Sequence, residues 1–296
     1  MVGRLIAIAN QKGGVGKTTT AVNLAIGLAA HERRVLLVDL DPQGNATSGL
    51  VPDSRFAQLK NSQRTIYQSI VGRYVVEAVL TKIREAVYIT PAGSDLAAAE
   101  VELTMIGAGE ERLARILATV RADFDYILID TPPSLGLLTL NALIAADSVI
   151  VPLQCEYFAL EGLGWLLDML RKVRSEFNSA LEIYGFVLTM FDTRGRVSYE
   201  VAREVRDHFP NKVFQSVIPR NVAIPESSSH GLSVIEYNGG SAGAQAYREF
   251  AAEILSHSVS PNGCASRQMA FASPKSWSLS VLLDREKRKV RRKVTQ

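Results

Sequence analysis

The chain has 296 residues, 47% of them hydrophobic and 21% charged, which is typical of a water-soluble globular protein. Its net charge of +3 is uneven, because residues 261–296 hold nine Lys/Arg against two Asp/Glu and residues 1–260 hold 24 against 28. There is no apolar run near the roughly 18 residues of a membrane span, and the two cysteines and four histidines are too scattered for a Cys/His metal site. These features argue against a membrane-spanning protein, a disulfide scaffold or a zinc module, and they predict a cytoplasmic protein.

Short apolar runs alternate with helical patterns along most of the chain. Such continuous apolar strands are typical of a parallel sheet that is covered on both faces. The expected strands are residues 4–10, 34–40, 86–93, 125–130, 147–154, 183–190 and 212–219. The expected helices are residues 17–31, 110–122, 158–176, 198–209 and 242–257. The alternation predicts a doubly wound α/β fold, with a mostly parallel sheet, helices on both faces and ligands at the carboxyl ends of the strands.

The first expected strand runs into the stretch ANQKGGVGKTTT, which has the pattern of a phosphate-binding loop. Gly16, Lys17 and Thr18 complete G-x-x-x-x-G-K-[ST], although Gln11 stands in place of the leading glycine. We expect Lys17 to reach the β/γ oxygens, Thr18 to ligate Mg²⁺ and Thr19 to contact a further phosphate. The backbone N–H groups expected to bind phosphate belong to Gly13, Gly14, Val15, Gly16 and Lys17. A glycine-rich turn without a ligand is the alternative.

Acidic residues close two later strands. Asp130 ends the run YILID, where a carboxylate can hold Mg²⁺ through water; a capping or turn aspartate before Pro132 is the alternative. Asp39 and Asp41 follow the second strand and, being two residues apart, point the same way from an extended chain. One of them would orient the attacking water and the other would serve the metal. Turn formation at Asp41 and Pro42 is the rival interpretation.

Together these segments resemble the ParA/MinD family of deviant Walker P-loop ATPases, and within it the chromosomal ParA proteins of the Soj type. Residues 12–19 match the family signature K-G-G-x-G-K-[ST]-[ST], and the similarity covers roughly residues 3–257. Further similar blocks are VLLVDLDPQGNATSGL, residues 124–143, QCEYFALEGL, LTMFDTR and IPRNV. The resemblance implies a ParA-type ATPase domain over residues 1–257. Residues 258–296 are then a Ser-rich linker and a basic tail, predicted to be disordered.

The resemblance also implies roles for single residues. Two subunits would sandwich ATP and Mg²⁺ in a homodimer, with the signature lysine, Lys12, reaching across to the partner's phosphates. Asp41 would be the hydrolytic aspartate, Asp39 would contribute to the metal site, and Pro219 and Asn221 would line the base pocket. The implied catalytic residues are Lys12, Lys17 and Asp41, and the implied metal residues are Thr18, Asp130 and Asp39.

The expected partners are nonspecific double-stranded DNA and a ParB-type protein that stimulates hydrolysis, which implies nucleoid association. Arg194 matches a basic position of the family and Arg196 lies beside it, so both are candidate DNA contacts. Ala223, however, replaces an arginine expected to touch DNA. Three interpretations of the tail stay open: a nucleic-acid contact through counterion release, a membrane anchor around WSLSVLL, or an extension without function.

The leading hypothesis is therefore an ATPase that drives DNA partitioning, for a chromosome or a plasmid. The alternative is a MinD-like spatial regulator that cycles on and off a membrane with the same switch. A third class, the electron-transfer proteins related to the nitrogenase iron protein, needs two cluster-ligating cysteines per subunit. Cys155 stands alone and Cys264 lies in the expected tail, which disfavours that class.

Overall fold

The structure is a computed structural model that describes residues 2–51, 57–59, 63–105, 107–156 and 161–259. The chain divides into one unit of Met1–Leu255 and a second of Ser256–Gln296. The predicted basic tail lies outside the described residues from residue 260 onward. Within the described ranges, no helix is both long and apolar enough to cross a membrane.

A single eight-stranded sheet forms the centre of the first unit, in the order β3-β4-β2-β5-β1-β6-β7-β8. All neighbouring pairs are parallel except β3 and β4. The strands are β1 (Arg4–Ile8), β2 (Val35–Asp39), β3 (Thr81–Lys82), β4 (Val87–Thr90), β5 (Tyr126–Asp130), β6 (Ser148–Gln154), β7 (Glu182–Phe191) and β8 (Val213–Pro219). The apolar strand sequences follow from this architecture, because β1, β2, β5 and β6 are buried nearly throughout.

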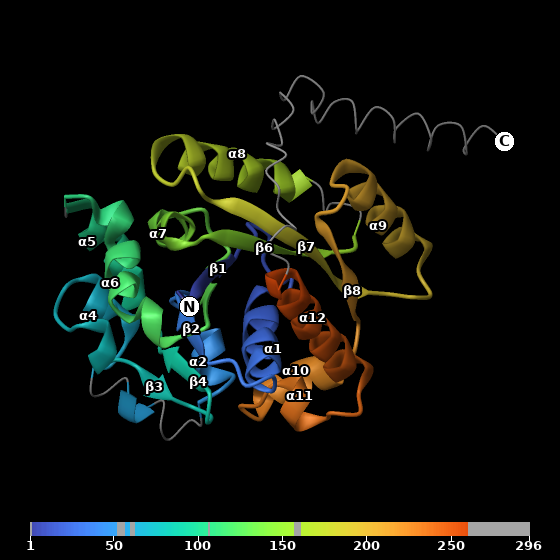
Figure 1. The fold of residues 1–296 in the computed structure, drawn as a ribbon, viewed down its shortest axis with the longest axis horizontal. Coiled ribbons are helices and arrows are strands. Elements are labelled where there is room, and N and C mark those ends of the chain that lie inside the picture. Colours follow the sequence, from blue (N-terminus) through green and yellow to red (C-terminus); the bar gives the residue numbers. More distant parts are fainter. Residues whose placement is uncertain (1, 52–56, 60–62, 106, 157–160, 260–296) are drawn as a thin grey trace. The chain divides into compact units, whose positions relative to one another are not determined.

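Helices cover both faces of the sheet (Figure 1). The α-helices are α1 (Lys17–Ala29), α2 (Asn45–Ser48), α4 (Ile66–Ile70), α5 (Leu96–Met105), α6 (Arg112–Val120), α7 (Leu137–Ala145), α8 (Glu161–Glu176), α9 (Arg196–His208), α10 (Ala223–Ser229), α11 (Val234–Tyr237) and α12 (Ala242–Val259). Short 3₁₀ turns occupy Val76–Ala78, Gly109–Glu111 and Arg121–Asp123. Helices α1 and α12 lie on one side of the central strands, and α7 and α8 lie on the other (Figure 1).

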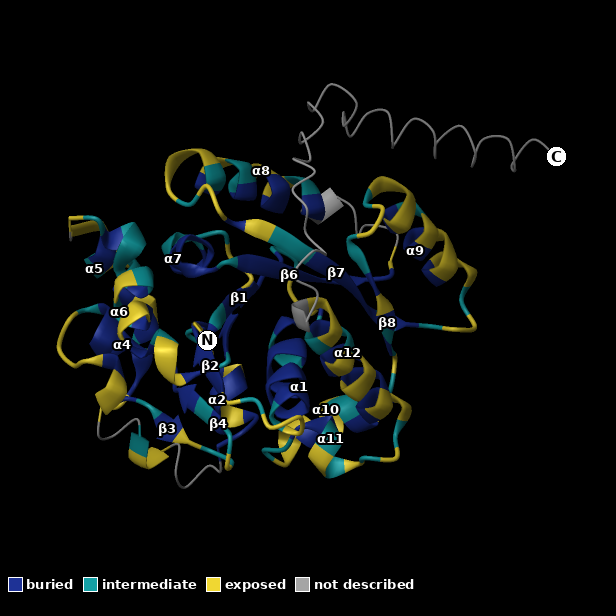
Figure 2. Cartoon of the chain, viewed as in Figure 1, coloured by how far each residue is buried: buried dark blue, intermediate teal, exposed yellow. Residues whose placement is uncertain are grey.

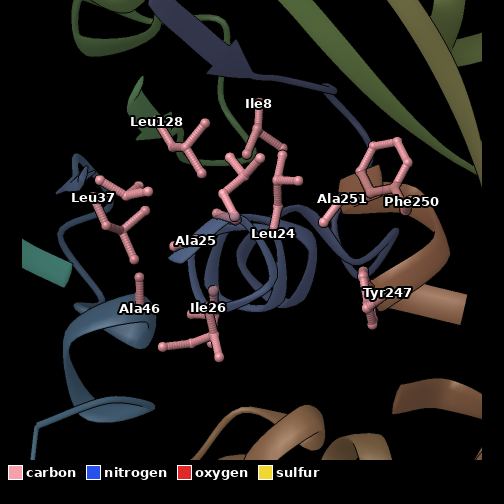
Figure 3. Packing of buried hydrophobic residues seen from close by; sticks show 14 of the residues in the cluster. Ile8, Leu24, Ala25, Ile26, Leu37, Ala46, Leu128, Tyr247, Phe250 and Ala251 are labelled. Atoms are coloured by element: carbon pink, nitrogen blue, oxygen red, sulfur yellow. The ribbon is translucent and has the colours of Figure 1, made fainter. Parts of the chain in front are cut away.

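A large hydrophobic cluster lies between α1, α12 and the sheet. Leu24 of α1 has no exposed surface, and its cluster includes Ile8 of β1, Leu128 of β5 and Phe250 of α12 (Figure 3). Figure 2 shows the same division, since the central strands and α1 are buried while the outer faces of α9 and α12 are exposed. Helix α1 is therefore buried over most of its length, and this packing anchors the loop at its N-terminus.

The sheet order places the expected site. Strand β1 lies between β5 and β6, so the chain leaves the carboxyl end of β1 at the point where the strand order changes direction. In register, Ile8 of β1 and Asp39 of β2 both pair with Asp130 of β5. The phosphate-loop residues and the acidic residues thus meet at the carboxyl ends of the central strands β1, β2 and β5.

The doubly wound fold is confirmed, and so are the seven expected strands, each within a few residues. The expected helices are also present, with α6 starting at Arg112 and α8 described from Glu161. The sequence analysis missed the short strand β3, which pairs antiparallel with β4. It also missed α2, α4, α5, α7, α10 and α11.

Candidate nucleotide-binding site

The loop between β1 and α1 has the backbone of a phosphate cradle. Gly14 (φ 73°) and Gly16 (φ 87°) are in the left-handed region, where residues with a side chain are strained. A Cβ atom at Gly13 or Gly14 would meet nothing within 4 Å, so this part of the loop faces open space. Backbone N–H groups at the start of a helix attract anions, and α1 begins at Lys17, directly after the loop.

Two polar side chains outside the motif hold the loop in place. Asn10 is buried; it donates from Nδ2 to the Pro152 carbonyl (2.7 Å) and accepts from the Lys12 N–H (3.0 Å). Thr189 of β7 donates from Oγ1 to the Val15 carbonyl at 2.8 Å. The loop is thereby fixed to β6 and β7, the strands on one side of β1. Neither side chain was predicted from the sequence, because the carbonyl that each one binds lies more than 140 residues away.

Lys17 is buried beneath the loop, with 7% of its surface exposed. Its Nζ donates to the Lys12 carbonyl at 3.2 Å. Burial lowers the pKa of the ammonium group, while the charges of Asp130 and Asp41 oppose that shift. The lysine expected to bind phosphate is therefore close to two of the acidic residues expected in the same site.

Among the three acids Asp39, Asp41 and Asp130, only Asp130 has a carboxylate without hydrogen-bond partners in the described part of the chain. It is fully buried, and neither carboxylate oxygen has a hydrogen-bond partner among the described residues. Burial raises its pKa well above the usual value and the charge of Asp39 adds to this, whereas the nearby Thr18 hydroxyl and Lys17 oppose it. An unpartnered buried carboxylate beside a hydroxyl is a fitting oxygen donor for Mg²⁺. The described residues contain no cluster of three or more His, Cys, Asp or Glu placed to hold a metal, but Mg²⁺ typically needs only one or two carboxylates beside phosphate oxygens and water.

Asp39 and Asp41 differ from Asp130 because protein donors already bind them. Asp39 accepts from the Asp41 N–H (3.2 Å) and from both the N–H (2.8 Å) and Oγ1 (2.6 Å) of Thr47. Burial raises the pKa of Asp39 to about 6, and these hydrogen bonds oppose the rise. Asp41 is 6% exposed, and its Oδ1 accepts from the Gln43 N–H at 2.9 Å. A metal-binding role of Asp39 therefore has less support than that of Asp130, and Thr47 is a site residue that the sequence analysis missed.

Lys12 makes an ion pair at the rim of the loop. Its Nζ lies 3.2 Å from Oε2 of Glu156, with side-chain exposures of 33% and 48%. Arg220, in the IPRNV block, lies 4.0 Å from the other oxygen of Glu156. Glu156 thus brings together two segments that the sequence analysis placed in the site separately. Half-exposed pairs of this kind contribute only about 0–1 kcal/mol, so Lys12 can leave Glu156 at low cost.

Of the two residues expected to line the base pocket, Pro219 lines a pocket and Asn221 makes a local hydrogen bond. Pro219 lines a pocket of about 470 Å³ together with Phe191, Tyr199 and Ala246. Asn221 accepts from the Ala223 N–H at 3.0 Å and so supports the start of α10. A second, polar pocket of about 290 Å³ opens beside Thr18 and Thr19. The base-pocket assignment stays a prediction.

The two arginines expected to touch DNA are exposed but locally paired. Arg194 is 88% exposed with its Nε 3.3 Å from Asp192, and Arg196 is 82% exposed with its Nε 2.8 Å from Glu200. Arg194 also lowers the pKa of Asp192 through hydrogen bonds from its backbone and side chain. The positive charge here is therefore partly balanced within the protein.

Cys155 is buried beside the site. It is the one cysteine within the described ranges, and burial raises its thiol pKa to about 12. A cluster or metal ligand must be a thiolate, so this environment does not favour the electron-transfer alternative. Cys264 lies outside the described residues.

Comparison with known proteins agrees with this geometry. Residues 3–183 match the AAA_31 family, described as an AAA domain. The chain is 47% identical over 257 residues to the sporulation initiation inhibitor protein Soj of Bacillus subtilis, covering 86% of this chain and all of that protein. It is 48% identical over 256 residues to the chromosome partitioning protein ParA of Myxococcus xanthus, covering 86% and 88%. The chain belongs to the ParA/Soj family of chromosome-partitioning ATPases.

A solved structure extends the comparison to the nucleotide site. The structure of cobyrinic acid a,c-diamide synthase from Mycobacterium smegmatis, with bound ADP and magnesium, is 40% identical in sequence to this chain, with a TM-score of 0.75. The alignment covers 86% of this chain and 95% of that one. That protein is named a synthase, so proteins named for different activities share this fold. The ParA/Soj assignment therefore rests on the sequence relatives, and the likeness of structure supports the fold.

Proposed function

We propose that this chain is a DNA-partitioning ATPase that dimerises when it binds ATP and separates after Mg²⁺-dependent hydrolysis. The Soj and ParA relatives support the partitioning part of the proposal, and one observation carries the nucleotide part. The open glycine loop, the buried Lys17 and the unpartnered carboxylate of Asp130 lie together at the start of α1. Backbone N–H groups, an ammonium group and a carboxylate are the groups that a nucleoside triphosphate and its metal require, and all three are present at the carboxyl ends of the central strands.

Each group has a distinct task in this proposal. The backbone N–H groups of residues 13–17 and the Lys17 ammonium bind the phosphates, while Thr18 and Asp130 hold Mg²⁺. The metal, when bound, neutralises negative charge that develops on the phosphates. Asp41 accepts a hydrogen bond from the attacking water and orients it toward the terminal phosphate.

Lys12 acts between subunits. It lies at the rim of the loop, and its half-exposed pair with Glu156 is weak enough to exchange for a stronger partner. In the ATP-bound homodimer its ammonium reaches the partner's phosphates, as an arginine finger does in trans. Dimer formation and hydrolysis are thereby coupled through one side chain.

The proposed partners are double-stranded DNA, bound without sequence preference, and a ParB-type protein that stimulates hydrolysis. The proposed location is the cytoplasm, on the nucleoid. The MinD-like alternative has less support, because the relatives described above are a Soj and a ParA protein.

Co-sedimentation with duplex DNA and with anionic liposomes, each with ATP or ADP and Mg²⁺, separates the two functions. We expect pelleting with DNA in ATP only, and none with liposomes. Lys17→Ala, which removes the phosphate-binding ammonium, is the control, and it should not pellet with DNA in either ATP or ADP. Binding to liposomes in ATP without binding to DNA would contradict the proposal and favour the membrane-cycling alternative.

A further inference from the structure

Asp39 is a fully buried carboxylate whose two oxygens are both in use. Oδ1 accepts from the Asp41 N–H at 3.2 Å, and Oδ2 accepts from the N–H and the hydroxyl of Thr47 at 2.8 Å and 2.6 Å. Hydrogen bonds to an ionised acceptor are about twice as strong as neutral ones. Asp130, its register partner, accepts no hydrogen bond of this kind among the described residues. The two neighbouring carboxylates therefore have different surroundings, which points to different tasks.

The donors to Asp39 bracket the segment 41–47. Within that segment, the Asp41 carboxylate accepts from the Gln43 N–H (2.9 Å), and the Asp41 carbonyl accepts from the Gly44 N–H (2.8 Å). Helix α2 starts after Gly44 without a side-chain cap. The segment is thus tied to itself, and Asp39 binds both of its ends to the carboxyl end of β2.

The Thr47 hydroxyl extends this connection to a third element. It accepts from the Ala92 N–H at 3.0 Å, in the loop between β4 and α5, while it donates to Asp39. One oxygen therefore joins β2, α2 and the β4–α5 loop. Ala46, next to Thr47, packs into the core near Leu37 (Figure 3), so α2 keeps an apolar anchor when the hydroxyl is removed.

We propose that Asp39 and Thr47 form a positioning pair, which holds the Asp41 carboxylate in place for hydrolysis, and that Asp39 does not ligate Mg²⁺. The functional consequence rests on the ATP hydrolysis proposed above, whereas the structural consequence rests on the buried hydrogen bonds alone. Displacement of a catalytic group by about 1 Å can cost roughly 100-fold in rate, so a small shift of this segment is measurable.

Thr47→Val removes the hydroxyl and keeps the shape of the side chain. With the full chain we expect the ATP hydrolysis rate at saturation to fall by about 10–100-fold. ATP affinity and the Mg²⁺ concentration for half-maximal rate should change by less than about threefold, because Lys17, Thr18 and Asp130 are intact. Thr47→Ser, which restores the hydroxyl, should recover the rate. Thr119→Val is the matched control, since Thr119 is exposed on α6 and its hydroxyl donates to a carbonyl of the same helix.

Hydrogen exchange in the nucleotide-free protein tests the structural part without any activity. Amides of residues 43–48 should exchange about tenfold faster in Thr47→Val than in the wild type, with the core of β1 and α1 unchanged. If the wild-type protein hydrolyses no ATP, the proposed function fails, while the exchange data still decide the positioning claim. If the amides of residues 43–48 exchange at the wild-type rate in Thr47→Val, the positioning claim is wrong.

Asp39→Asn separates positioning from metal binding. The amide nitrogen of the new side chain is a donor, so that side chain cannot accept hydrogen bonds at both of its terminal atoms, and the variant should resemble Thr47→Val. If instead it raises the Mg²⁺ requirement more than about tenfold while Thr47→Val does not, Asp39 is a metal ligand and the proposal is wrong.

Discussion

Asp130 buries a carboxylate that has no hydrogen-bond partner among the described residues, which is costly in the nucleotide-free protein. Leaving a buried polar group unpaired costs about 1–3 kcal/mol. Asp130→Asn removes the charge and keeps the shape, so we expect it to raise the thermal midpoint of the nucleotide-free protein while weakening Mg²⁺-dependent ATP binding. Scanning calorimetry and labelled-ATP titration would measure both effects.

The stability that Asp130→Asn adds to the nucleotide-free protein depends on pH, because the pKa of Asp130 is raised. Because the folded-state pKa lies above the unfolded one, the protonated form stabilises the fold below the unfolded pKa, and this contribution is lost as pH rises. The stability advantage of Asp130→Asn should therefore grow from pH 5 to pH 8. Asp147→Asn is the control for loss of a carboxylate, because Asp147 is paired with Arg121 at 2.7 Å and its loss should lower the thermal midpoint rather than raise it. A destabilised Asp130→Asn variant would contradict the account.

Lys12 and Lys17 share one loop but have different surroundings. Lys12→Ala should leave the affinity of the monomer for ATP within about threefold, because Lys17 and the backbone cradle remain, while it weakens the ATP-dependent dimer. Light scattering and nucleotide titration would separate the two effects. Lys82→Ala removes a similarly paired surface lysine, 3.2 Å from Glu85, and should change neither. A Lys12→Ala variant that dimerises as the wild type does would exclude the cross-subunit role.

At the scale of single residues, the sequence predicts that the loop and the acids form one site, and it does not predict the side chains that hold them. Lys17 and Asp130 belong to local motifs, so their neighbours in the chain indicate their chemistry. Asn10 and Thr189 bind carbonyls more than 140 residues away, and Thr47 accepts from Ala92 across 45 positions. Glu156 contacts Lys12 across 144 positions. These contacts depend on how strands are ordered in the sheet, which the local pattern does not specify.

Helix α9 and the turn before it carry the candidate DNA contacts. Arg194 and Arg196 are each paired with a nearby carboxylate, so phosphate must compete with those partners. Arg194→Ala should lower the slope of log affinity against log salt by at most about 0.9, the value for one duplex phosphate contact. Titration of labelled duplex with saturating ATP at several salt concentrations would measure it. Arg115→Ala, which removes a paired arginine of α6, is the control; an equal effect of both would mean that only net charge matters.

Four of the elements that were not predicted from the sequence have a clear physical explanation. Helix α7 (LLTLNALIA) is buried on nearly all sides, so it has no polar face and no helical periodicity to detect. Helices α2 and α11 have four residues each, too few to show a period. Strand β3 has two residues, and its pairing with β4 fixes it rather than its composition. The parallel strands were predictable because burial on both faces requires continuous apolar runs.

Over the whole chain, basic charge is concentrated near the C-terminus, where residues 284–296 hold seven Lys/Arg. Ala223 stands where the resemblance to the family predicts an arginine, so we expect deletion of 284–296 to reduce DNA affinity and its salt slope more than Arg194→Ala does. ATP-dependent dimer formation should be unchanged. A salt slope identical to that of the full chain would place the DNA contacts entirely within residues 1–283.

The coupling of ATP to dimer formation is tested most directly by the molar mass of Asp41→Ala. Loss of the water-orienting carboxylate should block hydrolysis and leave the phosphate cradle intact, so the ATP-bound state accumulates. Light scattering on the full chain with Mg²⁺ and ATP should give twice the 32.3 kDa of one chain, and with ADP the mass of one chain. A single-chain mass in ATP, at concentrations where ATP is bound, would contradict the account.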